Sequence, residues 1–330
     1  MRDLLRTIFG TKDGMRTLVL SPLYHAAPAS YLRIAMGEME TDGLVVIHDR
    51  FDAEAALRAI EEYRIDRLWM VPTMFVAMTK LPKETRDRYD ISSLRYIVHS
   101  AAPCPAEVKR QILDWFGPVL YEFYGSTEVG PVTLSTPSDF ANKPGNVGRA
   151  VGGTELLILG DDGQPLQAGD IGEIACRHAA WPEFTYINRE ADRRELDRGD
   201  LVATGDIGFL DDDGYLFLCD RKKNMIISGG VNIFPAEIEA VALEHHAIKD
   251  CAVFGIPDET FGEAIAIAVE LLDKATLEAL ELRVFLQERL ARYKVPKVIE
   301  FVDALPREDS GKIFKQRLRD PYWVGTGRSI

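Results

Sequence analysis

Short apolar segments alternate with segments of helical periodicity between Thr17 and Val129, and this alternation limits the possible folds more than any other feature. Short apolar runs fit buried strands, whereas apolar residues spaced three and four apart fit one face of a helix. We therefore predict an α/β fold in which crossover helices connect a largely parallel sheet. The expected strands are residues 18–20, 44–47, 68–71 and 96–98, and the expected helices are residues 53–63 and 106–116.

The rest of the chain has two further patterns. Residues 145–219 contain short strand-like runs joined by Gly and Asp turns, which is typical of antiparallel β structure. Beyond them, Pro235 begins a predicted helix, followed by predicted strands at 252–256, 264–271 and 298–302 and a helix at 276–292. We predict three parts, which are a partial α/β N-terminal domain (1–142), an antiparallel β subdomain (143–220) and a small α+β C-terminal domain (221–330).

Charge and composition narrow the classes of partner. The chain carries 39 Lys and Arg against 52 Asp and Glu, a formal net charge of -13. A surface of this sign disfavours phosphate backbones and anionic lipids, so we expect no nucleic acid partner and a small-molecule substrate instead. No apolar run approaches the ~20 residues of a membrane span, no signal-peptide pattern is present, and the four cysteines include no C-x-x-C pair. We therefore expect a cytoplasmic protein without an integral membrane segment.

The segment Tyr124-Gly125-Ser126-Thr127-Glu128 follows a strand-like run of the predicted sheet, a position where α/β proteins usually bind ligands. Its aromatic ring can stack on a purine, its hydroxyl groups can bond phosphate oxygens, and its carboxylate can hold Mg²⁺. The alternative interpretation is a turn between a strand and a loop, with a solvated Glu.

Two polar segments flank a β-hairpin signal further along the chain. The first is TGD, which ends at Asp206, and the second is DRKK, which contains Arg221. A carboxylate that accepts from a ribose diol, beside the rigid donor fork of an arginine, would hold a nucleoside sugar. A surface salt bridge is the alternative.

Two glycine-bearing segments follow. In SGGVNIFPAEIE, the pair Gly229-Gly230 after Ser228 can adopt positive φ or let the backbone approach a ligand. PREDSGK ends at Lys312, a point charge on a glycine-bearing turn that can be brought to an active site. The alternatives are a plain strand-to-helix loop and a solvated lysine.

The segments YGSTE, TGD, DRKK, SGGVNIFPAEIE and PREDSGK occur in this order, each at a spacing that fits the others. This set resembles the adenylate-forming (AMP-binding) superfamily, and the resemblance covers almost the whole chain. It implies that the C-terminal domain is a mobile lid and that the protein is an acid-thiol ligase using ATP, Mg²⁺ and CoA. In that reaction a carboxylic acid forms an acyl-adenylate and pyrophosphate, and CoA then displaces AMP.

The resemblance implies a role for each matching residue of the first segment. Tyr124 would pack on adenine, and Gly125 and Ser126 would belong to the same nucleotide-binding segment. Thr127 would contact phosphate, and Glu128 would coordinate Mg²⁺. Thr127 and Glu128 are thus predicted to act in catalysis as well as in binding.

The later segments receive roles in the same way. Asp206 and Arg221 would hold the ribose and Lys223 would lie at the hinge, while the CoA channel would be lined by Ser228, Gly229 and Gly230. Lys312 would bridge the substrate carboxylate and the α-phosphate, where it stabilises charge that develops during transfer. Removing Lys312 should impair adenylation and spare thioester formation.

Two upstream segments match the family less closely. Residues 22–25, ending in His25, resemble the segment whose aromatic or histidine residue gates the acyl pocket. Residues 99–103 stand where the family has a Gly-rich adenine loop, and only Ala102 and Pro103 match it closely. The absence of an Asp near His25 favours a fatty or aryl acid:CoA ligase over an amino-acid-activating domain.

Residues 1–21 depart from the family pattern because they lack its phosphate loop, a run rich in Ser, Thr and Gly that ends in Pro-Lys. The nearest candidate, residues 10–14, lacks the run of hydroxyls, and we interpret it as a linker or fragment start. We expect an N-terminally truncated chain whose exposed N-terminal face is covered by an oligomer partner or a separate chain. The alternative functions are a catalytically impaired protein that binds AMP or acyl-adenylate, half of a split enzyme, and thioester formation alone.

Overall fold

The structure is a computed structural model that describes residues 2–37, 42–102, 104–307 and 313–324. Contacts within the chain divide it into two compact units. Unit 1 comprises residues 1–204 and 208–218, and unit 2 comprises residues 205–207 and 219–330. Each unit has its own apolar clusters. The predicted three-part division at residues 142 and 220 stays a prediction.

Five parallel strands form the first part of the sheet of unit 1, in the order β2-β1-β3-β4-β5. Four of them match predicted strands to within two residues at each end. Their bounds are β2 (Leu44–Ile47), β1 (Arg16–Val19), β3 (Arg67–Met70), β4 (Tyr96–His99) and β5 (Leu120–Ser126). The prediction of a largely parallel sheet is therefore confirmed for this part of the chain.

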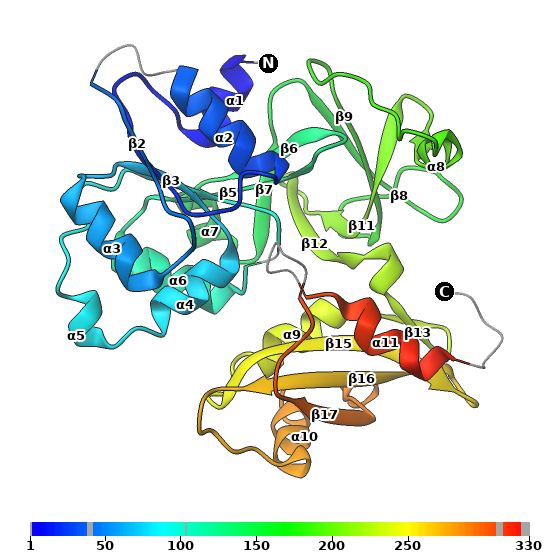
Figure 1. The fold of residues 1–330 in the computed structure, drawn as a ribbon. Coiled ribbons are helices and arrows are strands. Elements are labelled where there is room, and N and C mark those ends of the chain that lie inside the picture. The colour runs from blue at the N-terminus through cyan, green and yellow to red at the C-terminus, as the bar shows by residue number, and fades with distance from the viewer. Residues whose placement is uncertain (1, 38–41, 103, 308–312, 325–330) are drawn as a thin grey trace. The chain divides into compact units, whose positions relative to one another are not determined.

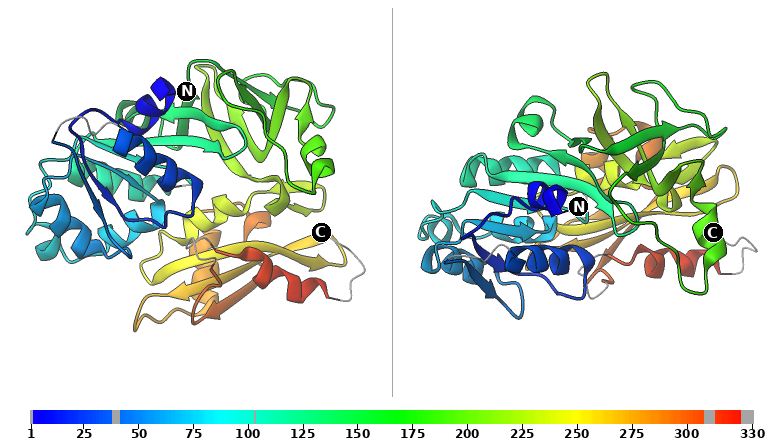
Figure 2. Two further views of the ribbon diagram at one scale, coloured as in Figure 1. Left: turned by 45° about the horizontal axis from the view of Figure 1, so that its top comes forward. Right: turned by 90° about the horizontal axis from the view of Figure 1, so that it is seen from above.

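Helices cover both faces of the parallel strands, as Figures 1 and 2 show. Alternating residues of a strand point to opposite faces, so Leu68 and Met70 of β3 pack in one apolar cluster and Trp69 packs in the other. The cluster that contains Leu68 and Met70 includes residues of α3 (Ala53–Glu62), α4 (Pro72–Thr79) and α6 (Ala106–Phe116). The cluster that contains Trp69 includes residues of α1 (Arg2–Phe9) and α2 (Ala26–Gly37).

The predicted helices begin and end close to the predicted residues for local reasons. Asp52 precedes α3 and its carboxylate accepts the Ala55 N–H at 2.8 Å, which satisfies one free donor of the first turn. Ala56, Leu57 and Ile60 of that helix are fully buried, as their spacing predicts. The short helix α5 (Lys83–Arg86) follows α4 on the surface.

Antiparallel strands continue the same sheet beyond β5, in the order β6-β7-β12-β11-β9-β8, with β10 (Asp197–Arg198) beside β11. Their bounds are β6 (Gly130–Ser135), β7 (Asn146–Ala150), β8 (Thr154–Leu159), β9 (Gly172–His178), β11 (Leu201–Leu210) and β12 (Tyr215–Arg221). Two short helices, α7 (Pro137–Asn142) and α8 (Glu190–Glu195), lie between these strands in sequence. Residues 145–219 are thus antiparallel β structure, as predicted.

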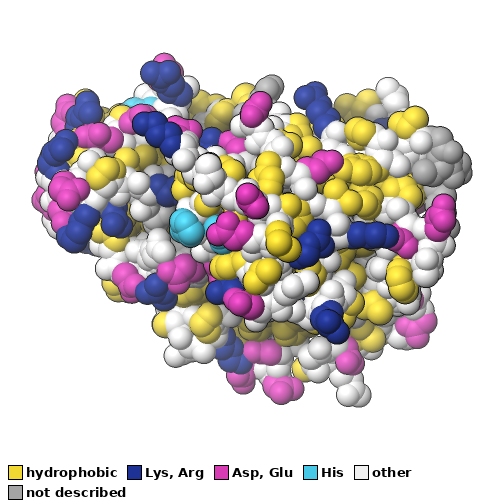
Figure 3. Space-filling view, turned by 90° about the horizontal axis from the view of Figure 1, so that it is seen from below, with side chains coloured by type: hydrophobic (Ala, Val, Ile, Leu, Met, Phe, Trp, Pro, Cys, Tyr) yellow, Lys and Arg dark blue, Asp and Glu magenta, His cyan; other side chains and the backbone are white. Residues whose placement is uncertain are grey.

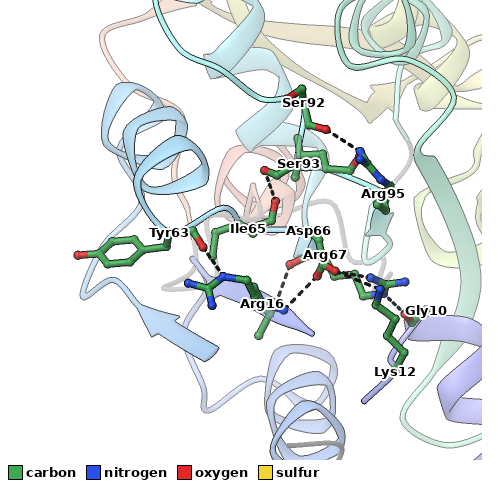
Figure 4. Close-up of polar contacts among 12 residues, drawn as sticks. Gly10, Lys12, Arg16, Tyr63, Ile65, Asp66, Arg67, Ser92, Ser93 and Arg95 are labelled. Carbon is green, nitrogen blue, oxygen red and sulfur yellow. Dashed lines mark hydrogen bonds and ion pairs between the residues drawn. The ribbon is translucent and has the colours of Figure 1, made fainter. Parts of the chain in front are cut away.

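Residues 10–14, interpreted from sequence as a linker or fragment start, connect two packed elements of unit 1. Ahead of them Leu5, Ile8 and Phe9 of α1 are at most 4% exposed, and after them β1 begins. The Gly10 carbonyl accepts a hydrogen bond from the Arg67 guanidinium, in the network that Figure 4 shows. The segment is therefore a short connection between α1 and β1, and its interpretation as a linker or fragment start stays a prediction.

Asp66 is the centre of that network at the amino ends of the parallel strands (Figure 4). Its carboxylate accepts the backbone N–H of Arg16 at 3.0 Å and pairs with the Arg67 guanidinium at 2.8 Å and with Lys12 at 3.6 Å. Residues 10–14 consequently lie at the edge of the sheet opposite to the carboxyl ends of the strands.

Unit 2 is a sheet with helices on both faces, in the strand order β14-β13-β16-β15, with β17 parallel to β16. The helices α9 and α10 pack on one apolar cluster and α11 packs on the other. The bounds are β13 (Ile226–Ser228), β14 (Val231–Ile233), α9 (Pro235–Ala242), β15 (Ile248–Asp258), β16 (Gly262–Leu271), α10 (Ala279–Gln287), β17 (Val298–Val302) and α11 (Lys315–Trp323). The whole chain is a mixed α/β protein, as predicted.

The surface carries charges of both signs. On the face shown in Figure 3, Lys and Arg side chains lie among Asp and Glu side chains and apolar atoms. In the part of the chain that the structure describes, no helix combines the length and the apolar character needed to cross a membrane.

Candidate functional site

Three of the predicted site segments follow strands that run in the same direction. His25 comes after β1, Ala102 comes after β4, and the segment that starts at Tyr124 ends β5. Because β1, β4 and β5 belong to one set of parallel strands, these segments share the carboxyl edge of the sheet. This edge is where α/β proteins bind ligands. Pro103, the neighbour of Ala102 in the predicted adenine loop, lies outside the described residues.

The Tyr124–Glu128 segment forms the end of β5 and the start of the hairpin turn that leads into β6. The pairing register shifts between Tyr124 and Gly125. A Cβ atom on Gly125 would lie 2.1 Å from the Gly130 carbonyl oxygen, so only glycine allows the two backbones to approach this closely. Ser126 Oγ accepts the Val129 N–H at 3.4 Å, which closes the turn.

Tyr124 is 9% exposed and belongs to an apolar cluster with Val129 and Val132 of the same hairpin. Most of its ring is therefore committed to packing inside unit 1. The predicted packing of Tyr124 on adenine, and the predicted roles of the neighbouring residues, stay predictions.

Two aromatic residues from the loop after β9 hold the turn. The Tyr186 hydroxyl donates to Glu128 Oε1 at 3.1 Å, and Trp181 Nε1 donates to the Thr127 carbonyl oxygen at 3.3 Å. Burial, together with the adjacent Glu128 carboxylate, raises the pKa of Tyr186, so its phenol remains a donor at neutral pH. Neither residue is predicted from the sequence, because their spacing from the turn gives no local signal.

Three buried ionisable residues on β4, β5 and α6 form a cluster. Lys109 of α6 and Glu122 of β5 form an ion pair of 2.7 Å, although they are only 2% and 6% exposed. His99, at the end of β4, is fully buried, and its Nε2 lies 3.8 Å from Glu122 Oε2. Burial lowers the pKa of His99 to about 4, so the imidazole is neutral near pH 7.

The sequence offered one signal for this cluster. Lys109 lies three residues before Ile112, on the apolar face of the predicted helix 106–116, where an unpaired charge would be unfavourable. A buried partner is therefore required, and Glu122, two residues before Tyr124, supplies it.

His25 precedes the first residue of α2 and is partly buried. Its backbone N–H donates to the Pro22 carbonyl at 3.3 Å, and its ring centroid lies 4.7 Å from that of Tyr24, which is 66% exposed. The exposed ring of Tyr24 and the ring of His25 thus lie together at the carboxyl edge of β1. The role of His25 as the acyl gate stays a prediction.

The other predicted residues belong to unit 2. Arg221 Nε lies 2.7 Å from Asp206 Oδ1, with side-chain exposures of 47% and 13%. The two residues predicted to hold the ribose therefore form an ion pair, which is also what the salt-bridge alternative expects. Lys223, the predicted hinge residue, is exposed in a short 3₁₀ turn over Lys222–Asn224.

The pair Gly229-Gly230 is the two-residue turn of the β13–β14 hairpin. Both residues have positive φ, 58° and 81°, as glycine permits. The Gly229 N–H donates to the Phe261 carbonyl at 2.8 Å, and Ser228 pairs with Gly262 of β16. The two glycines predicted to line the CoA channel thus form an exposed hairpin turn, and their role in binding CoA stays a prediction. Lys312, the predicted adenylation lysine, lies outside the described residues.

Two family profiles match the chain. The profile described as AMP-binding enzyme matches residues 1–181, and the profile described as AMP-binding enzyme C-terminal domain matches residues 237–312.

Two curated relatives extend this likeness. The chain is 36% identical over 307 residues to a feruloyl-CoA synthase of Amycolatopsis sp, and 37% identical over 305 residues to an indoleacetate–CoA ligase of Aromatoleum aromaticum. Each alignment covers 92% of this chain but only 61% and 59% of the respective relative. The chain therefore spans less than two thirds of the length of these relatives.

A solved structure agrees with the fold. The o-succinylbenzoate CoA synthetase MenE of Bacillus subtilis, in complex with the acyl-adenylate intermediate OSB-AMP, is 28% identical to this chain with a TM-score of 0.82. The likeness covers 97% of this chain and 63% of that structure.

Proposed function

The chain belongs to the AMP-binding enzyme family, and from this premise we propose that it takes part in ATP-dependent ligation of a fatty or aryl acid to CoA. The observation that carries the proposal is the position of the Tyr124–Glu128 turn at the carboxyl edge of the parallel strands, where α/β proteins bind ligands. The names of the feruloyl-CoA synthase and the indoleacetate–CoA ligase support an acid and CoA as substrates.

The proposed chemistry has two steps. A carboxylate oxygen attacks the α-phosphorus of ATP, the bond to the bridging oxygen breaks, and pyrophosphate leaves. The CoA thiolate then attacks the acyl carbon, the bond between that carbon and the phosphate oxygen breaks, and AMP leaves. Lys312 would stabilise the charge of the first step, whereas the second step does not require it.

Glu128 is the proposed ligand of Mg²⁺. A carboxylate provides the hard oxygen that this ion prefers, and Mg²⁺ is commonly held by one or two carboxylates together with substrate phosphates. Tyr186 donates to one oxygen of Glu128 and so orients the carboxylate. When bound, Mg²⁺ would neutralise charge on the phosphate oxygens. Thr127 would bind phosphate, and Asp206 with Arg221 would hold the ribose.

The test is AMP release by the purified chain in the presence of ATP, Mg²⁺, CoA and a panel of fatty and aromatic acids. We expect release that requires both an acid and CoA. Lys312→Ala should abolish pyrophosphate exchange while thioester formation from a synthetic acyl-adenylate continues. No release with any acid of a broad panel would contradict the proposal.

A second candidate function takes into account that the chain spans only 61% of the length of the feruloyl-CoA synthase. The chain would then bind AMP or acyl-adenylate without completing adenylation, or would carry out thioester formation alone. Calorimetric AMP binding without pyrophosphate exchange would favour this candidate. Exchange that disappears in Lys312→Ala would contradict it. A cytoplasmic location and an oligomeric or separate partner chain stay predictions.

A further inference from the structure

The carboxylate of Asp220, near the end of β12, joins two segments of unit 2 by hydrogen bonds. Its Oδ1 accepts the backbone N–H of Arg221 at 2.7 Å and the side-chain amide of Asn224 at 3.3 Å. Its Oδ2 accepts the backbone N–H of Ala236 at 2.8 Å, 16 residues further along the chain. The carboxylate therefore connects the residues at the end of β12 to the start of α9.

The first turn of α9 needs an acceptor from outside the helix. Pro235, its first residue, has no N–H, and the side chain of Phe234 before it accepts no capping hydrogen bond. Ala236 is therefore the first residue of α9 with an N–H to satisfy, and Asp220 provides the acceptor. The helix dipole also favours a carboxylate at this end. Asp220 thus acts as the cap of a helix that begins far from it in sequence.

The helix α9 is itself packed in unit 2. Ile238 is fully buried in the apolar cluster that it forms with residues of β15 and β16. Glu239 pairs with Lys315 of α11 at 2.6 Å and accepts the Val253 N–H of β15 at 2.6 Å. Burial alone would lower the pKa of Lys315, but Glu239 and Asp220 raise it above its ordinary value, so a cation lies near both carboxylates. Asp220 is thereby attached to a packed element.

Arg221, the residue after Asp220, is one of the two residues proposed to hold the ribose. Its Nε lies 2.7 Å from Asp206 Oδ1, although its side chain is 47% exposed. An exposed arginine side chain has many accessible rotamers, so ordering its guanidinium costs entropy. The hydrogen bond from the Arg221 N–H to Asp220 holds the backbone from which this side chain extends. Asp206, Asp220, Arg221 and α9 all belong to unit 2.

We propose that Asp220 is a positioning residue for Arg221: by joining it to the first turn of α9, Asp220 keeps the guanidinium beside Asp206 in the geometry that binds a ribose diol. This inference rests on the proposed ribose-binding role of Asp206 and Arg221. A donor fork that is already in place loses less entropy on binding than one that the ligand must order. Asp220 needs no contact with the nucleotide to have this effect.

The test is calorimetric binding of AMP by the purified chain and by the variant Asp220→Ala. The comparison ligand is 2′,3′-dideoxy-AMP, which keeps the adenine and the phosphate but lacks the ribose hydroxyls. Asp52→Ala is the matched control, because Asp52 also accepts a first-turn N–H at 2.8 Å, from α3 of unit 1. Asp220→Asn keeps one acceptor oxygen and takes the place of Asp220→Ala if that variant does not fold.

We expect Asp220→Ala to weaken AMP binding about tenfold and to change dideoxy-AMP binding less than about twofold. Asp220→Asn should show a smaller loss of the same kind, and Asp52→Ala should bind both ligands as the unmodified chain does. Equal losses for AMP and dideoxy-AMP in Asp220→Ala would show that the variant damages the fold in general, and would overturn the inference.

A double variant shows whether Asp220 acts through Arg221. In Arg221→Ala the guanidinium that Asp220 positions is already absent, so adding Asp220→Ala should weaken AMP binding no further. Losses that add in the double variant would mean that Asp220 acts by another route, and would also overturn the inference.

Hydrogen exchange separates this inference from the proposed function. Exchange of the Arg221 and Ala236 amide hydrogens should become faster in Asp220→Ala and stay unchanged in Asp52→Ala. If the unmodified chain binds no AMP, the proposed function fails, and these amides still show whether Asp220 holds Arg221 to α9. Unchanged protection of both amides in Asp220→Ala would overturn the positioning role even if the chain bound AMP tightly.

Discussion

Glu122 is the central residue of the cluster of buried ionisable side chains on β4, β5 and α6. Its carboxylate pairs with Lys109 at 2.7 Å and lies 3.8 Å from the imidazole of His99. All three side chains are buried, and a buried ion pair contributes little net stability compared with apolar residues, whereas removal of one partner is strongly unfavourable. The cluster therefore joins α6 to β5 at a position two residues before Tyr124.

His99 should make the stability of unit 1 depend on pH. Its pKa is about 4 in the folded protein, below the ordinary value of 6.5, because burial disfavours the imidazolium despite the nearby Glu122. Between these values the unfolded chain binds a proton that the folded chain does not, so the free energy of unfolding falls as the pH falls. We expect a decrease of about 2 kcal/mol from about pH 7.5 to about pH 5, measured by urea unfolding.

The control for this prediction is the pair of variants His99→Gln and His48→Gln. His99→Gln should remove most of the decrease that the histidine causes, whereas His48→Gln, at the partly exposed position after β2, should retain it. An identical pH dependence in His99→Gln and the unmodified protein would show that His99 is not the responsible group.

Tyr186 should strengthen the binding of Mg²⁺ by its proposed ligand, Glu128. Tyr186→Phe removes the hydrogen bond to Glu128, and loss of such a supporting contact typically weakens metal binding about tenfold or more. We expect the Mg²⁺ concentration for half-maximal pyrophosphate exchange to rise by about that factor. Tyr215→Phe is the matched control, because Tyr215 donates to Asp139 at 2.7 Å elsewhere in unit 1. Equal Mg²⁺ requirements in the two variants would contradict the role of Tyr186.

At the scale of elements, the β5–β6 hairpin depends on close contacts that only glycine allows. Gly130 begins β6 with a φ of 73°, and a Cβ atom there would lie 2.4 Å from the indole of Trp181. The same indole donates to the Thr127 carbonyl, so the packing of one ring couples the hairpin to the loop after β9. The turn between β5 and β6 is thus held by a side chain of the loop after β9, which lies far from it in sequence.

Gly130→Ala should therefore be more destabilising than an alanine at another glycine of similar φ. Gly163 is the matched control, because its φ is 76° and a Cβ atom there would have no heavy atom within 4 Å. The alanine in each variant is strained by the positive φ, but only in Gly130→Ala must the side chain of Trp181 also move. We expect the additional loss to be about 1–3 kcal/mol in urea unfolding. Equal losses would show that Trp181 moves aside freely.

At the scale of the whole molecule, the two units have separate apolar clusters. Unit 1 also exposes apolar side chains, with Leu23 40%, Met36 62% and Ile47 55% exposed, and β2 is an edge strand. Exposed apolar side chains and sheet edges are features that a partner can cover, and the expectation that another polypeptide covers this part of unit 1 stays a prediction. The net charge of -13 favours solubility of the chain with these side chains exposed.

Separate cores predict that the two units can lose structure independently. Leu286→Ala empties a fully buried position in α10 of unit 2, and such a change typically costs about 2–5 kcal/mol. Hydrogen exchange measured at increasing urea should show earlier unfolding of unit 2 peptides and unchanged unfolding of unit 1 peptides. The reverse pattern is expected for Gly130→Ala. A single common transition in both variants would contradict independent units.

The sequence by itself determined the parallel strands, helices α3 and α6, the antiparallel region and the ordered motifs, because strand alternation, helical spacing and turn residues act over a few positions. It did not predict α1 or α2, and it missed α4, which is apolar on most of its surface, and α11, which is polar and contains Pro321. Only the tertiary structure revealed that Tyr186 supports Glu128, that Lys109 pairs with Glu122 and that Lys315 pairs with Glu239. These partners lie on different elements, so no local pattern encodes their meeting, and the packing of the sheet brings them together.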